Sequence, residues 1–391
     1  MASRIEVGLL AALAADYGGG GSNYLVQTPA GVLYAFAIDG ASDVYFRKST
    51  DGGITWGDAT VVFAGTATQL AVWYDEWSGV SGGKIRLAYA ESVTDDVLYR
   101  DLDVDTDTLG TQTTIYAGTD TAGNANALSI VTARGGNLVC VYDIDGGAED
   151  GAAKSTDGGA TWGAIADPTE GAADMWLLAP GWNADSQDVQ LIFWDVSADE
   201  ISVKRYDDSG DAWAETSIST GMVEQTQGTA YPHFAVAVDT TNSQNVVIAW
   251  NGIDTANADL KCWTVTDSAV TAKTDVVTNV TDDCGLAALS VDVVSGRWTA
   301  FWAGNTDGSE TWVTSVSVYS STSTDGGTTW SSPLQVVYTP METRTLFTAN
   351  RGYGGQIVSR VVALGDQAST AGGLCVSVPL RGLSASFQLG L

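Results

Sequence analysis

Residues 49–58 read STDGGITWGD, and nearly the same ten residues return as STDGGATWGA at 155–164 and STDGGTTWSS at 323–332. All three fit the pattern S-x-D-x-G-x-x-W. In such a turn the carboxylate accepts hydrogen bonds from nearby backbone N–H groups and the glycine adopts the positive φ of a tight hairpin. The tryptophan ring is large enough to pack into the seam beside the next repeat. The repeated stretch therefore predicts a structural turn rather than a site of chemistry.

These roles fall to the same four residue types in each copy: Ser49, Asp51, Gly53 and Trp56; Ser155, Asp157, Gly159 and Trp162; Ser323, Asp325, Gly327 and Trp330. A degenerate fourth copy, YDDSGDAW at 206–213, has Tyr206 in place of serine and keeps the spacing with Asp208, Gly210 and Trp213.

A second periodicity surrounds these turns. Short apolar segments that end in an aromatic residue recur every 52 to 56 residues, at Phe36, Tyr89, Tyr142, Trp194, Trp250 and Trp302. Each segment has one more short strand pattern before it and two after it, separated by Gly, Asn or Asp turns. Repeated units of four antiparallel strands are typical of the blades of a β-propeller. The sequence therefore predicts an all-β chain folded as one β-propeller domain over 1–391.

Seven blades are expected, with residues 1–15 closing the ring as a strand of the last blade. Their expected ranges are 22–63, 66–116, 123–166, 174–218, 231–277, 283–338 and 345–391. Six blades are the alternative, because the seventh unit is degenerate.

Composition narrows the function classes. The 391 residues are 45% hydrophobic and carry a formal net charge of −30. Such a surface repels nucleic acid and anionic membranes, because it lacks the cations that neutralise phosphates. No stretch approaches the ~20 apolar residues of a membrane span, and Glu6 interrupts the segment that imitates a signal peptide. We expect no membrane insertion and no cleaved leader. We also expect buried free thiols at the cysteines, because one histidine and no CxxC spacing argue against zinc.

The S-x-D-x-G-x-x-W turns resemble the Asp-box (BNR) repeats of sialidases and related β-propeller proteins. That resemblance implies that the turns are structural and lie on the face opposite the active site. It further implies, for a sialidase, a tyrosine nucleophile paired with a glutamate, an aspartate acid/base, and three arginines that grip the substrate carboxylate. Only Arg344 falls clearly on the expected ligand face, so the arginine triad is not visible.

Carboxylates occupy that face instead. The residues expected to bind a ligand are Asp39, Asp95, Asp143, Asp195, Asp254 and Asp307, together with Arg344. An acidic mouth of this kind repels an anionic sugar, whereas a neutral-sugar glycosidase needs only two carboxylates ~5–9 Å apart. Ordinary solvated loop carboxylates are the simpler interpretation of each aspartate.

Calcium is the one cofactor that the sequence suggests. The stretch DIDGGAEDG at 143–151 offers Asp143, Asp145, Glu149 and Asp150 in one glycine-rich loop. Oxygen-rich flexible loops suit Ca²⁺, although this one does not match the EF-hand pattern.

We interpret the chain as a non-enzymatic propeller module of a virion or a cell surface. Its resemblance to the non-catalytic propellers of tailed phages and adhesins implies binding of a glycan or receptor, or assembly with other virion or surface proteins, including copies of itself. The alternative is an exo-acting glycoside hydrolase, sialidase-like or specific for neutral sugars, that uses paired carboxylates.

Overall fold

The computed structural model describes residues 4–7, 24–53, 55–74, 83–118, 125–144, 149–168, 175–195, 198–222, 233–252, 258–280, 284–304, 316–348, 351–352, 360–367 and 370–377. Regular structure in these ranges is β-strand, numbered β1 to β30. In this part of the chain no helix is long and apolar enough to cross a membrane.

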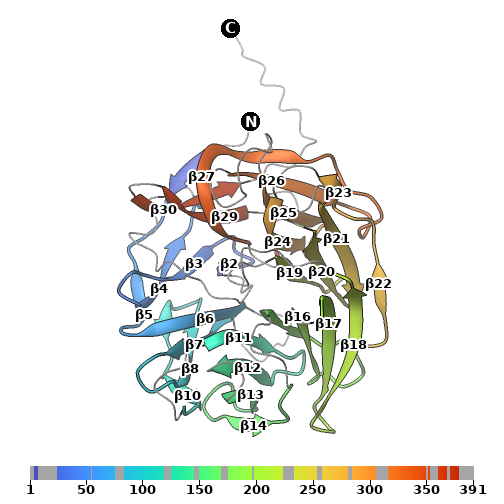
Figure 1. Ribbon diagram of the computed structural model, residues 1–391. Helices are drawn as coiled ribbons and strands as arrows, with labels where there is room; N and C mark the ends of the chain where they lie inside the picture. Colours follow the sequence, from blue (N-terminus) through green and yellow to red (C-terminus); the bar gives the residue numbers. More distant parts are fainter. Residues whose placement is uncertain are drawn as a thin grey trace.

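The strands form six sheets that follow one another around a ring, so the fold is a six-bladed β-propeller (Figure 1). Blade 1 contains β2 (Leu25–Gln27), β3 (Leu33–Ile38), β4 (Val44–Ser49) and β5 (Thr60–Phe63). Blade 2 contains β6 (Ala67–Tyr74), β7 (Lys84–Glu91), β8 (Val97–Asp103), β9 (Thr108–Leu109) and β10 (Thr113–Tyr116). Blade 3 contains β11 (Ala125–Thr132), β12 (Leu138–Ile144), β13 (Glu149–Ser155) and β14 (Gly163–Ile165).

Blade 4 contains β15 (Met175–Pro180), β16 (Val189–Asp195), β17 (Glu200–Asp207) and β18 (Ala212–Thr220). Blade 5 contains β19 (Phe234–Asp239), β20 (Gln244–Asn251), β21 (Ala258–Val265), β22 (Val270–Ala272) and β23 (Val277–Val280). Blade 6 is an eight-stranded sheet of β24 (Cys284–Asp292), β25 (Trp298–Gly304), β26 (Val316–Ser323), β27 (Leu334–Thr348), β28 (Arg351–Gly352), β29 (Arg360–Gln367), β30 (Thr370–Ser377) and β1 (Arg4–Val7).

The prediction of a propeller with four-stranded antiparallel blades is confirmed, but the count of seven is wrong and the six-bladed alternative holds. The strands expected to form a separate seventh blade over 345–391 instead extend the sixth sheet. The cause is β27, which pairs with β26 over its first half and with β29 over its second half. Within the expected closing segment 1–15, residues 4–7 form β1, which pairs antiparallel with β30 at the edge of the sixth sheet.

Burial decreases from the inner strands to the rim. The second strands β3, β16 and β20 are buried over nearly their whole length, whereas the outer strands β14 and β18 are mostly exposed. A strand that is buried on both faces has apolar residues at consecutive positions. The recurring segments of the sequence are continuously apolar because they form these inner strands. Their terminal aromatics, from Phe36 to Trp302, are at most 4% exposed.

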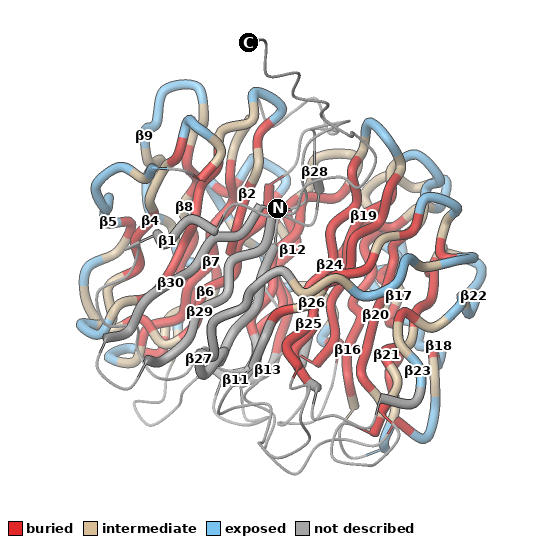
Figure 2. Tube along the Cα trace, turned by 90° about the horizontal axis from the view of Figure 1, so that it is seen from above, coloured by how far each residue is buried: buried red, intermediate tan, exposed pale blue. Residues whose placement is uncertain are grey.

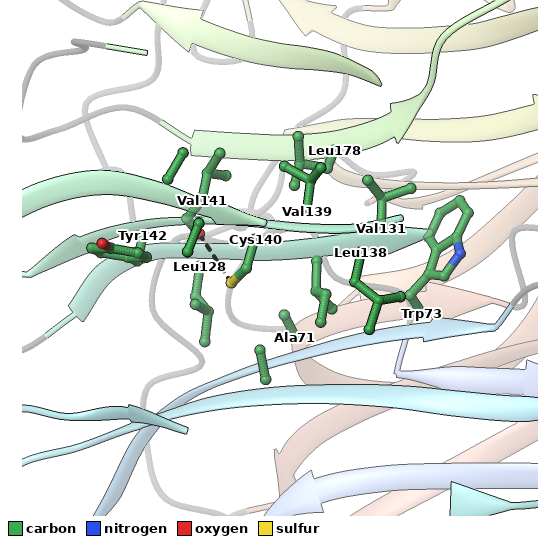
Figure 3. Close-up of a cluster of buried hydrophobic side chains, with 14 of the residues drawn as sticks. Ala71, Trp73, Leu128, Val131, Leu138, Val139, Cys140, Val141, Tyr142 and Leu178 are labelled. Atoms are coloured by element: carbon green, nitrogen blue, oxygen red, sulfur yellow. Dashed lines mark hydrogen bonds between the residues drawn. The ribbon is translucent and has the colours of Figure 1, made fainter. Parts of the chain in front are cut away.

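The seams between blades form the core. Residues 138–141 of β12 pack between Ala71 and Trp73 of blade 2 and Leu178 of blade 4 (Figure 3). Cys140 lies at the centre of this seam as a free thiol, and burial raises the pKa of its side chain. Cys262 is likewise a buried free thiol, as the sequence predicted for both.

The ring has two faces, defined by the direction of the strands. Hairpins between first and second strands and between third and fourth strands lie on one face, which we call the turn face. Hairpins between second and third strands, and the connections between blades, lie on the other, which we call the loop face. In Figure 2 the turn face is uppermost, and the exposed turn beside β9 marks it.

Candidate functional site

The three repeated turns have the same spacing of residues and form the same set of hydrogen bonds. In blade 3, Ser155 Oγ donates to Asp157 Oδ1 at 2.8 Å and accepts from the N–H of Gly159 at 2.8 Å. Thr161 donates to the same carboxylate through its N–H at 2.9 Å and its hydroxyl at 2.6 Å. These bonds, from Thr161 first, lower the pKa of Asp157 to about 2. The carboxylate is thus a fixed acceptor and not an acid/base.

The other two copies repeat the pattern. Ser49 Oγ lies 2.8 Å from Asp51 Oδ1 and 2.7 Å from the N–H of Gly53. Ser323 Oγ makes the equivalent contacts with Asp325 and Gly327, both at 2.9 Å.

Two of the three turns, those of blades 3 and 6, also fasten their blade to the preceding blade. Thr113, at the start of β10 in blade 2, donates through Oγ1 to the carbonyl oxygen of Gly159 at 2.7 Å. In blade 6, Trp330 Nε1 donates to Thr274 O of blade 5 at 2.9 Å, and Thr274 N–H returns a bond to Gly327 O at 3.1 Å. The tryptophan was expected in the seam with the next blade. That expectation is wrong for these two blades. The ring centroid of Trp162 lies 5.3 Å from that of Tyr99 in blade 2, and Trp330 bonds to Thr274 of blade 5, so both rings contact the preceding blade.

The degenerate copy in blade 4 keeps the tryptophan hydrogen bond to the preceding blade, but a different aspartate caps the turn. Trp213 Nε1 donates to Ala166 O of blade 3 at 2.7 Å. Asp207, and not Asp208, caps the turn by accepting from the N–H of Gly210 at 3.0 Å. Asp208 instead forms an ion pair with Lys154 at 2.8 Å.

On the loop face, carboxylates hold the hairpins in shape. Asp39 Oδ1 accepts from the N–H of Asp43 at 3.0 Å. Asp43 Oδ1 accepts from the N–H of Gly65 at 2.8 Å, which ties the hairpin to the connection between blades 1 and 2. Blade 2 repeats this tie, with Asp96 Oδ1 3.1 Å from the N–H of Gly118. These aspartates therefore serve the backbone first.

Glu91 is the most strongly committed carboxylate of this face, and the sequence analysis did not single it out. It accepts from the N–H groups of Val93 and Thr94, each at 2.8 Å, and from the Thr94 hydroxyl. Burial alone would raise its pKa, but these bonds and that from Asp96 outweigh it and lower the pKa to about 2. Its sequence signal is its place, two residues after the aromatic end of a second strand.

Asp95 lies beside this cradle at the turn of the same hairpin. Its φ is 56° and it is 2% exposed, so its carboxylate is turned into the protein. Ser42 and Asp199 take the same left-handed conformation at equivalent positions, with φ of 62° and 53°. The position is a structural one shared by three blades.

Two blades place acidic residues directly opposite one another at the loop-face ends of their second and third strands. Asp143 is paired with Asp150 across β12 and β13, and Asp195 with Glu200 across β16 and β17. Asp195 Oδ1 also accepts from the N–H of Ala198 at 2.9 Å. Asp143, Asp150 and Asp195 are among the residues expected from the sequence and Glu200 is not, and only the strand register shows the two cross-strand pairs.

The rest of the predicted ligand and metal set is only partly placed. Glu149 is paired with Ile144 in β13, and Arg344 lies in β27 at a register shift between Thr343 and Thr345. Asp145, Asp254 and Asp307 lie outside the described residues. Within the described ranges no group of three or more His, Cys, Asp or Glu residues could hold a metal ion, so calcium at 143–150 stays a prediction.

Six arginine side chains are described, and they are spread over five blades. Five donate to backbone carbonyl oxygens: Arg47 to Gly57, Arg86 to Gly158, Arg100 to Gly110, Arg134 to Gly181 and Arg205 to Thr266. Arg297, the sixth, is buried, and its guanidinium interacts electrostatically with Asp292. These six arginines serve the scaffold and do not gather into a carboxylate-binding triad.

No protein-family model matches the chain, and no curated protein matches its sequence. Its structure is similar to that of an ulvan lyase, of the polysaccharide lyase family PL25, bound to -[GlcA(1-4)Rha3S]-. The TM-score is 0.59 and the identity 10%, over 96% of both chains. It is also similar to the NanB sialidase of Streptococcus pneumoniae, with a TM-score of 0.51 and 9% identity over 75% of this chain and 67% of that one.

The sialidase of Trypanosoma rangeli gives a TM-score of 0.50 at 11% identity, over 82% of this chain and 59% of that enzyme. Identities this low bear on the fold alone. The chain therefore has a sialidase-like β-propeller fold.

Proposed function

We propose that the chain is a non-enzymatic β-propeller module that binds a glycan on its loop face. The sialidases and the ulvan lyase that share its fold act on or bind glycans, which supports this class of ligand. The net charge of −30 favours a neutral glycan over a sialylated, uronate or sulfated one, because like charges repel.

One observation carries the non-enzymatic part of the proposal. Described loop-face carboxylates, among them Asp39, Asp43, Glu91 and Asp96, accept hydrogen bonds from backbone N–H groups. A glycosidase acid needs a raised pKa near the working pH, whereas the pKa of Glu91 is lowered to about 2. Such carboxylates stabilise the hairpins, and neither the lowered pKa of Glu91 nor the bonds to the backbone suit the general acid of a glycosidase.

The proposal includes a location and partners. The repeated turns resemble Asp boxes, and non-catalytic propellers with this resemblance serve virions and adhesive surfaces. We therefore place the chain in a virion or on a cell surface, in contact with other structural proteins.

A glycan array tests the proposal, because it presents neutral and anionic glycans side by side. We expect binding to neutral glycans and none to sialylated ones. Glu200→Gln, in the loop-face pair with Asp195, should weaken binding, while Asp51→Asn on the turn face should leave it unchanged. Hydrolysis of a fluorogenic sialoside or neutral glycoside by the folded protein would overturn the non-enzymatic assignment.

A second candidate, a glycoside hydrolase that uses two carboxylates, rests on the cross-strand pairs Asp143–Asp150 and Asp195–Glu200. Directly opposite residues in antiparallel strands have Cβ atoms ~4.5–5.5 Å apart, so paired carboxylates within catalytic range are feasible. The candidate predicts that Asp143→Asn or Asp150→Asn abolishes any hydrolysis detected, with glycan binding retained.

A further inference from the structure

Strand β18 forms the outer rim of blade 4 and is unlike the other described outer strands. It runs for 9 residues, Ala212–Thr220, whereas β5, β10, β14 and β22 have 4, 4, 3 and 3. It is the last strand in the order β15-β16-β17-β18, and Figure 1 shows it at the rim of the ring. Among the described residues no strand pairs with its outer edge.

This edge lacks most of the features that usually prevent strand pairing. Natural proteins protect edges with short strands, prolines, lysines or bulges. The sequence of β18, AWAETSIST, contains no proline and no lysine. Its one register shift lies near its end, where Ser217 and Ser219 face consecutive residues of β17. The six residues before that shift, all exposed except the half-buried Trp213, form a regular ladder that can accept another strand.

The side of β18 that looks toward blade 3 is negatively charged. Trp213 contacts Ala166 of blade 3 through its indole N–H, which identifies that side. Glu215 lies two residues further along and is 48% exposed in its side chain. Exposed carboxylates flank it at Asp167, in the connection after blade 3, and at Asp211, before the strand.

One cation offsets part of this charge. Lys204 Nζ forms an ion pair with Glu215 Oε2 at 3.9 Å, interacts electrostatically with Asp167 and donates to Pro168 O. The carboxylates Glu215 and Asp167 therefore share one lysine on this side. Arg205 looks toward blade 5, where it donates to Thr266 O. A strand added at the rim would therefore meet negative charge on one of its two faces.

We propose that β18 is a docking edge for an extended basic segment of a partner protein, which adds to blade 4 as a fifth strand. The backbone of the segment would pair with β18, and lysine or arginine at every second residue would face Glu215 and Asp167. Main-chain pairing supplies affinity in strand addition, and alternate side chains supply specificity. A second copy of this chain fits less well, because it would bring Glu215 and a net charge of −30 toward an edge of the same sign.

The test uses a fluorescent nine-residue peptide that alternates lysine with threonine or valine, and fluorescence anisotropy with the full chain. We expect binding that weakens with salt. A second peptide carries the same side chains but is N-methylated at alternate residues, so that one edge cannot donate hydrogen bonds. We expect this peptide to lose binding.

Two variants with the same change of charge localise the site. Glu215→Lys should weaken binding about tenfold, as expected when an ion pair at an exposed rim becomes a repulsion. Asp58→Lys, an exposed carboxylate in blade 1, should change it less than ~2-fold by the same reasoning. Thermal melts establish that both variants are folded.

Three results would overturn the proposal. One is equal binding of the N-methylated peptide, which would indicate only electrostatic adhesion. Another is an equal loss in Asp58→Lys and Glu215→Lys. The third is a dimer of the wild-type chain in sedimentation that Glu215→Lys dissociates, which would assign the edge to a second copy.

Discussion

The two adjacent glycines of the blade 3 turn offer a sharp test of what this turn does. Both have positive φ, +77° at Gly158 and +98° at Gly159. A Cβ at Gly158 would meet no atom within 4 Å, whereas a Cβ at Gly159 would lie 2.1 Å from Cε1 and 2.5 Å from Cζ of Tyr99. Alanine at the first position therefore reports backbone strain alone, and alanine at the second adds a collision with blade 2.

The expected costs follow from these two terms. A non-glycine residue in the left-handed region costs ~1–2 kcal/mol, so Gly158→Ala should lower the free energy of unfolding by about that amount. Overpacking a filled site adds ~1–3 kcal/mol, so Gly159→Ala should cost ~2–5 kcal/mol in total. The Tyr99 ring cannot retreat easily, because it is buried and packs edge-to-face with the Trp162 ring, with ring centroids 5.3 Å apart.

Urea unfolding at constant m-value measures both changes. A double-mutant cycle then isolates the collision: in a Tyr99→Val background the extra cost of Gly159→Ala should disappear and leave only the backbone term. Equal costs for the two glycines, or no rescue by Tyr99→Val, would refute the packing of this turn on blade 2.

Three further predictions concern the same molecule. Ser155→Ala should destabilise the protein by ~1–3 kcal/mol, because the buried N–H of Gly159 loses its acceptor. Urea unfolding measures this loss, and Ser155→Thr, which keeps the hydroxyl, serves as the conservative control. Trp162→Ala should lower the free energy of unfolding by ~2–3 kcal/mol, below the usual ~3–5 kcal/mol for a fully buried ring, because this ring is only half-buried. The glycan affinity of the folded variant should not change. A loss of affinity without a loss of stability would make the turn a binding site. The pKa of Glu91 is lowered from 4.5 to about 2, so its contribution to stability is present above pH 4.5 and lost as the pH falls toward 2. The melting temperature of Glu91→Gln should therefore fall less steeply with decreasing pH than that of the wild type. Parallel curves would contradict the hydrogen bonds assigned to the Glu91 carboxylate.

Sequence periodicity predicted most of the fold because each blade repeats one burial pattern. The aromatic ends of the second strands recur at nearly constant intervals since they fill equivalent places in the seams. The blade count failed at β27, because the expected boundary between the ranges 283–338 and 345–391 falls inside this one strand. The structure runs through it, and Pro340 falls in a register shift between Val337 and Met341, where a missing N–H is tolerated.

The candidate site was less predictable, because a carboxylate's role depends on the geometry of its turn. Asp207 and Asp208 are adjacent in sequence, yet one caps a turn and the other pairs with Lys154 of the preceding blade. The sequence likewise shows that Asp143 and Asp150 are close in the chain, but only the hairpin register sets them face to face. The spacing in the sequence predicts which residue types lie on the loop face, but it does not predict which groups they bond to.

The fastening of the blade 3 and blade 6 turns to the preceding blades gives assembly a direction. In blades 3 and 6 the residues that fasten the seam are synthesised after the blade they hold, as with Thr113 and Gly159 or Thr274 and Trp330. A blade emerging from the ribosome therefore waits about one repeat for its outer strand to be secured. The pairing of Arg4–Val7 with β30 waits longest, since its partners Gly373–Val376 are among the last strand residues to be made. Contacts so distant in sequence form slowly, which makes closure of the ring the expected late step of folding.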